Sequence, residues 1–147
     1  MSKLFIYYSY YGSGDVVANY LKEKGYEIRK VESKLKLSKV FLFAMLGGGF
    51  KAMTNKKPKL INYDSDVSNY DEVVIGSPIW NDRLAPVINT VLKETNLSNK
   101  KLTFVFYSGS GFGKKATEKV IKLYNAPVII LKEPKKYKEE LNKLEEL

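Results

Sequence analysis

The stretch YDEVVIGSPIWNDRLAPVINTVL, residues 70–92, places a strand, a polar loop and a helix in direct succession. The apolar residues of 70–78 run on without alternation, which is typical of a strand covered on both faces, and we expect the strand to stop at the Ser-Pro pair. Pro86 stands early in 84–95, as a proline of a first helical turn does. The apolar face of this predicted helix comprises Leu84, Val87, Val91 and Leu92.

The same order of strand, loop and helix recurs on both sides of this stretch. Further strands are predicted at 3–9, 26–32, 100–111 and 127–131, the second of them near a sheet edge because it carries charges. Further helices are predicted from Asp15 to a stop at Gly25, over 114–124 and over 134–147. Five strands that alternate with helices predict an α/β fold, a doubly wound and mostly parallel sheet with helices on both faces. We expect one domain over residues 1–147.

Ligands of such sheets bind beyond the carboxyl ends of the strands, where the strand order switches. Three loops follow the buried strands, at 9–15, 77–86 and 107–115, and they are also the three most unusual in composition. We therefore predict a ligand site where these loops meet. The alternative is that they are ordinary turns whose glycines and serines serve backbone geometry alone.

The first loop has the features of an anion site. Gly12 and Gly14 free its backbone, Ser9 and Ser13 offer hydroxyls, and the helix that follows points its N-terminus into the loop. The loop has no lysine or arginine. It matches neither the GxxxxGK(S/T) pattern of nucleoside triphosphate sites nor the GxGxxG pattern of dinucleotide sites. A mononucleotide therefore fits better than ATP, GTP or NAD.

The other two loops have features that suit a flat ring. Trp80, the only tryptophan, lies in a polar cluster and is either a stacking platform or a rim residue that covers the core. Backbone groups of 78–81 are placed to hydrogen-bond a ring edge. The N–H groups of Gly109, Ser110 and Gly111 line either the polar edge of a heterocycle or a second anion site.

Composition restricts the chemistry. The chain has no cysteine and no histidine, which excludes disulfides, thiol catalysis and the commonest general base. Any chemistry needs carboxylates, hydroxyls, backbone groups or a bound cofactor. No signal peptide is visible and the longest apolar run is too short for a membrane span, so we expect a cytoplasmic protein. The net charge is +9, but the lysines are spread along the chain, so nucleic acid is not the expected partner.

At this point the sequence resembles the flavodoxin family from about Lys3 to Leu131. Family members open with a strand and a phosphate loop of the form S/T-x-S/T-G-x-S/T, which Ser9 to Gly14 match at the first hydroxyl and the glycine. Residues 70–92 match more specifically, with an aspartate-led strand, a G-S/T-P-x-W/Y loop and a proline-started helix.

The resemblance implies the strand order 2-1-3-4-5 and non-covalent FMN, with electron transfer as the function. It implies that the phosphate lies on the first loop and the ring between the other two, near Trp80, with N5 of the ring facing a backbone carbonyl near Asn81. The implied cofactor-binding residues are Ser9, Tyr10, Tyr11, Gly12, Ser13, Gly14, Asp15, Ser77, Pro78, Ile79, Trp80, Asn81, Asp82, Ser108, Gly109, Ser110, Gly111, Phe112 and Gly113.

Two departures from the family bear on this expectation. Tyr11 and Gly14 stand where the family has small hydroxyl residues, and each lost hydrogen bond to a charged group costs roughly 1.5–3 kcal/mol, so we expect weaker FMN binding. Flavodoxins that carry electrons are typically acidic, whereas this chain has a charge of +9, so we expect a redox partner with an acidic docking surface.

Alternatives stay open. One is a flavin-dependent reductase that takes hydride from a nicotinamide cofactor and passes it to a quinone or a similar small acceptor. Another is a module of this fold that has lost or weakened FMN binding. Residues 33–60 join the second and third strands, with a predicted helix at 37–46 that either covers the sheet or forms an apolar flap near the flavin.

Overall fold

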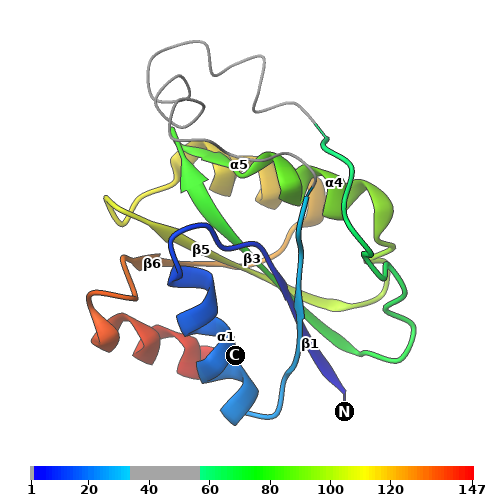
Figure 1. The fold of residues 1–147 in the computed structure, drawn as a ribbon, viewed down its shortest axis with the longest axis horizontal. Helices are drawn as coiled ribbons and strands as arrows, with labels where there is room; N and C mark the ends of the chain where they lie inside the picture. The colour runs from blue at the N-terminus through cyan, green and yellow to red at the C-terminus, as the bar shows by residue number, and fades with distance from the viewer. Residues whose placement is uncertain (1, 34–56) are drawn as a thin grey trace.

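Five parallel strands form the centre of the computed structural model, which describes residues 2–33 and 57–147 (Figure 1). They are β1 (Lys3–Tyr7), β2 (Glu27–Lys30), β3 (Glu72–Trp80), β5 (Lys101–Ser108) and β6 (Val128–Lys132). Their order across the sheet is β2-β1-β3-β5-β6. Counted along the chain, this is the predicted order 2-1-3-4-5, and the charged strand β2 lies at the edge, as predicted.

A sixth strand, β4 (Arg83–Leu84), pairs with the end of β3 in the antiparallel direction. The prediction that the strand stops at the Ser-Pro pair was therefore wrong, because β3 runs on to Trp80. The turn between β3 and β4 consists of Asn81 and Asp82, with φ angles of 49° and 64°. Two residues with positive φ make the tight hairpin turn that Asn and Asp favour, and the pairing of β4 keeps the last residues of β3 extended.

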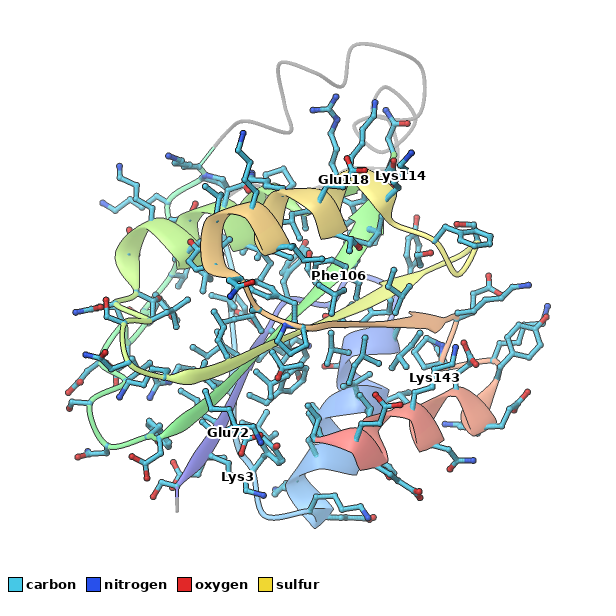
Figure 2. The ribbon with its side chains drawn as sticks, turned by 180° about the vertical axis from the view of Figure 1, so that it is seen from behind. Lys3, Glu72, Phe106, Lys114, Glu118 and Lys143 are labelled. Carbon is cyan, nitrogen blue, oxygen red and sulfur yellow. The ribbon has the colours of Figure 1, made fainter. Side chains whose placement is uncertain are left out.

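Helices cover both faces of the sheet (Figure 1). One face carries α4 (Pro86–Glu94) and α5 (Lys114–Tyr124), and the other carries α1 (Ser13–Glu23) and the 3₁₀ helix η1 (Lys138–Glu146). Side chains alternate along each strand and therefore feed two separate cores. In β5, Phe104 and Phe106 pack in the core that includes α4 and α5, whereas Val105 and Tyr107 pack in the core that includes α1 and η1. Figure 2 shows Phe106 pointing toward α5.

The last helix differs from its prediction. Residues 134–147 were expected to form a helix with Tyr137, Leu141 and Leu144 on one face, but the structure has a 3₁₀ helix there. Leu141, Leu144 and Leu147 recur every three residues, which is the period of a 3₁₀ helix, and all three pack against the core beneath α1. The spacing of these leucines explains why this tighter helix is favoured.

The connection between β2 and β3 is described only at its ends. Ser33 and Leu60 pair through an isolated antiparallel bridge, and Leu60 is buried. The helix predicted at 37–46, and the choice between a sheet cover and a flap, lie outside the described residues. Within the described parts of the chain, none of the helices has the length and apolar content needed to cross a bilayer.

Candidate functional site

A cavity of about 320 Å³ lies where the three predicted loops meet. The carboxyl ends of β1, β3 and β5 are neighbours in the sheet, so the loops that follow them share one edge. The structure brings together residues from all three loops, and two more that were not predicted; the lining comprises Ser9, Tyr10, Tyr11, Ser13, Pro78, Ile79, Trp80, Tyr107, Ser108, Gly109 and Glu133.

The remaining predicted residues fall into two groups. A second hollow of about 430 Å³ shares Ile79, Ser108 and Gly109 with the cavity. It adds Asn81, Asp82, Ser110 and Phe112, together with Lys114, which Figure 2 shows at the start of α5. Neither hollow is lined by Gly12, Gly14, Asp15, Ser77, Gly111 or Gly113.

The first loop turns sharply before α1. Gly12 has a φ of 94°, a left-handed conformation that favours glycine, and α1 begins at the next residue. The Ser9 hydroxyl accepts a hydrogen bond of 3.1 Å from the N–H of Gly14. The start of α1 therefore faces the cavity with Ser13 in its wall, and the helix dipole favours an anion there.

Crowding explains why position 14 has no hydroxyl side chain. A Cβ at Gly14 would lie 2.6 Å from the hydroxyl of Tyr107 and 2.8 Å from both Ser9 Cβ and Tyr7 Cδ2. Tyr107 is buried, and its hydroxyl donates a hydrogen bond to the backbone carbonyl of Tyr8. The tyrosine at the end of β5 therefore occupies the space into which a serine or threonine at position 14 would extend.

Aromatic residues also line the cavity, namely Tyr10, Tyr11, Trp80 and Tyr107. Trp80 is half-buried and meets Tyr8 and Tyr10 edge to face, with ring centroids 6.0 and 6.2 Å apart. Burial, together with the nearby Tyr10, raises the pKa of Tyr8 to about 12, so this ring is neutral at neutral pH. Trp80 packs against the core, as a rim residue does, and also lines the cavity, so its role as a stacking platform stays a prediction.

Two predicted residues have partners within the protein. The Ser77 hydroxyl donates to the carbonyl of Pro78 at 2.8 Å and accepts the N–H of Ala85 at 3.2 Å, so it ties the two ends of the hairpin together. Asp15 accepts a hydrogen bond of 2.7 Å from the Tyr7 hydroxyl and forms an ion pair of 3.0 Å with Lys30. Burial opposes its charge, but the Tyr7 hydrogen bond and Lys30 outweigh it and hold the pKa of Asp15 below its usual value.

The third loop is built around Ser108. The Ser108 hydroxyl accepts the N–H of Gly111 at 2.9 Å and donates to the carbonyl of Phe112 at 2.8 Å. Of the three N–H groups predicted to line a heterocycle, that of Gly111 is therefore directed into the loop itself. The Phe112 side chain is 76% exposed at the rim of the second hollow.

The sequence-based prediction missed Tyr107, Glu133 and Lys135. Glu133 lines the cavity from the connection between β6 and η1. The Lys135 ammonium donates a hydrogen bond of 3.2 Å to the carbonyl of Tyr11, in the loop that has no cation of its own. The signal that could have found them is the carboxyl end of the last predicted strand, 127–131, because ligands of such sheets bind beyond the carboxyl ends of the strands.

Comparisons with known proteins agree with this architecture. A family model described as flavodoxin matches residues 50–146. A flavoprotein from Lactobacillus acidophilus NCFM, solved in complex with FMN, is 20% identical, with a TM-score of 0.70 over 94% of this chain and 97% of that one. An azoreductase from Bacillus anthracis str. Sterne is 18% identical, with a TM-score of 0.52 over 99% and 96% of the two chains. General stress protein 14 from Treponema denticola, in complex with FMN, is 13% identical, with a TM-score of 0.51 over 99% and 95%. A comparison with curated proteins finds no match.

Restoring a hydroxyl at position 14 should destabilise the protein. We expect Gly14→Ser to lower the free energy of unfolding by about 1–3 kcal/mol, because its Cβ clashes with Tyr107, Ser9 and Tyr7. Denaturant unfolding measures the change, and the added Tyr107→Phe should recover part of it by removing the nearest atom. Gly109→Ser is the matched control, since its Cβ meets only Glu133 Oε1 at 3.9 Å. Equal stability of Gly14→Ser and the control would contradict the crowding.

Asp15 should contribute stability only where it is ionised. Because its pKa is lower in the folded protein, its contribution is present above the unfolded value of about 3.9 and is lost as pH falls through the folded value. We expect Asp15→Asn to cost about 1 kcal/mol at pH 7 and to approach the wild type in acid. Denaturant unfolding at several pH values tests this, with Glu139→Gln on exposed η1 as the control. A difference that does not change with pH would show that the charge of Asp15 is not its source.

Proposed function

Because this chain belongs to the flavodoxin family, we propose that it binds FMN non-covalently in the cavity and carries electrons through that cofactor. One observation carries the proposal: a single cavity joins a glycine-containing loop at a helix start to a wall of aromatic rings. FMN has a phosphate at one end and a flat ring at the other. The volume of about 320 Å³ falls within the range of small-molecule sites.

The residues present fit this cofactor. The helix start and the hydroxyls of Ser9 and Ser13 suit a phosphate monoester, which the loop would hold by backbone and hydroxyl donors. Trp80 suits an aromatic ring and would exclude water from one side of it. When bound, FMN supplies one- and two-electron redox chemistry, which none of the side chains of this chain provides. The residues of the three loops would bind and orient it.

The proposal extends to a partner and a compartment. A net charge of +9 supports a redox partner with an acidic docking surface, since opposite charges steer encounter. The absence of cysteine fits a protein of the cytoplasm. The proposal also treats residues 1–147 as a single flavodoxin-like domain.

The second hollow favours a second candidate function. It adjoins the cavity through Ile79, Ser108 and Gly109, and its volume of about 430 Å³ leaves room for a small acceptor beside a bound flavin. A reductase that takes hydride from a nicotinamide cofactor would need such a space. One of the structures of similar fold is an azoreductase, which supports keeping this candidate.

FMN binding can be read from the only tryptophan of the chain. We expect added FMN to quench the fluorescence of Trp80, and protein to quench that of FMN, because the two rings would lie together. Trp80→Ala should raise the Kd roughly three- to tenfold, and Trp80→Phe should raise it less. Leu123→Ala, exposed on α5, is the control. If the protein binds no FMN, the proposal is wrong, and the remaining alternative is a module of this fold that has lost FMN binding.

Turnover separates the carrier from the reductase. We expect the FMN-loaded protein to oxidise NADH or NADPH no faster than free FMN, with or without a quinone, if it is an electron carrier. Steady-state absorbance at 340 nm measures this. Saturable turnover would favour the reductase. If Phe112→Ala then reduces this turnover and leaves the Kd for FMN unchanged, the second hollow is the acceptor site.

A further inference from the structure

The connection between β6 and η1 reaches the cavity from a side that the three loops do not occupy. We propose that this connection is a fourth ligand-binding segment, in which Glu133 accepts a hydrogen bond from the sugar or ring of a bound flavin and Lys135 balances the charge of its phosphate. This inference rests on the proposed binding of FMN. It adds residues from a strand end that lies outside the three loops.

The backbone of Glu133 is held in an unfavourable conformation. Its φ is 38°, a left-handed value that residues other than glycine rarely adopt, and the following Pro134 disfavours it further. Three hydrogen bonds fix it: the N–H of Glu133 donates to the backbone carbonyl of Ser108 at 3.1 Å, and the carbonyl of Glu133 accepts the N–H groups of Lys136 and Tyr137 at 2.9 Å each. Strain of this kind persists where the surroundings enforce it, and it is concentrated at ligand sites.

The side chain of Glu133 is directed to the cavity. It forms part of the wall, and its Oε1 lies 3.9 Å from the point where a Cβ would extend from Gly109. Within residues 2–33 and 57–147, this carboxylate takes part in none of the ion pairs. A carboxylate with open acceptor positions suits a hydroxyl or N–H donor of a ligand. The ribityl hydroxyls and the ring imide of a flavin are donors of that kind.

Lys135 is directed to the first loop. Its ammonium donates to the carbonyl of Tyr11, and it lies 3.4 Å from the point where a Cβ would extend from Gly12. An ammonium has three N–H donors, and the Tyr11 carbonyl uses one. In the described part of the chain, Lys135 forms no ion pair with a carboxylate. Its charge already acts within the loop, since it contributes to the lowered pKa of Asp15.

The neighbouring lysines face elsewhere. The ammonium groups of Lys132 and Lys136 lie over the ring of Tyr137, at 5.8 and 5.3 Å from its centroid. Lys143 pairs with Glu140 at 2.9 Å. Of these four lysines, Lys135 alone contacts the loop that precedes α1, so it is the one placed to offset a phosphate.

Comparison of FMN with riboflavin tests the two roles, because riboflavin has the same sugar and ring without the phosphate. We expect Lys135→Gln to raise the Kd for FMN roughly tenfold, less at high salt, and to leave that for riboflavin within twofold. Lys135→Arg should restore FMN binding. Glu133→Ala should raise the Kd for both flavins by a similar factor, and Glu133→Gln should retain most of the affinity. Flavin fluorescence measures the Kd, and Lys136→Gln and Glu139→Gln are the matched controls.

Each other outcome has a distinct meaning. If the wild type binds neither flavin, the proposed function fails and this inference fails with it. If the wild type binds both flavins and the variants match their controls, only the fourth segment is refuted. If Lys135→Gln weakens FMN and riboflavin equally, Lys135 holds the backbone of the loop and has no role at the phosphate. Denaturant unfolding of each variant separates these results from loss of fold.

Discussion

Parallel pairing of three neighbouring strands is the constraint on which the rest of this molecule depends. Tyr7 of β1 lies opposite Gly76 of β3, and Pro78 of β3 lies opposite Tyr107 of β5. Because the pairing is parallel, the three strands end at the same edge of the sheet, and the loops that follow them line one cavity. A shift of one residue in either pairing would exchange the two faces of a strand and bury the wrong side chains. The register that fills the two cores therefore also builds the candidate site.

The crowding at Gly14 shows how the residue at one position limits the residue at another. Tyr107, near the end of β5, fills the space behind the first loop, and its hydroxyl donates a hydrogen bond to the carbonyl of Tyr8, the residue after β1. Position 14 of the loop therefore needs a glycine, the residue without a Cβ. The departure from the flavodoxin pattern at position 14 is thus a packing requirement of this chain. It need not signal a change of ligand, because backbone N–H groups at a helix start can bind an anion without that hydroxyl.

Much of the fold was predictable because its signals are local. Five apolar runs separated by helical patterns were enough to predict the doubly wound sheet and the convergence of three loops, and the resemblance to the flavodoxin family supplied the strand order. The hairpin at Asn81 and Asp82 was missed because positive φ angles at two non-glycine residues have only a weak sequence signal. Glu133 and Lys135 were missed for another reason. The end of the strand at 127–131 points to the residues that follow it, but the contact of Lys135 with Tyr11 joins residues 124 positions apart, and no local pattern encodes that contact.

The loop at Tyr11 and the connection at Glu133 lie far apart along the chain, so they are synthesised at different times. The ribosome makes the loop at Tyr11 early and the connection at Glu133 only after every other element that lines the cavity. At synthesis rates of about 5–20 residues per second, the early loop waits several seconds for its last neighbours. The wall of the cavity is therefore completed only late in synthesis, after β6 has been made.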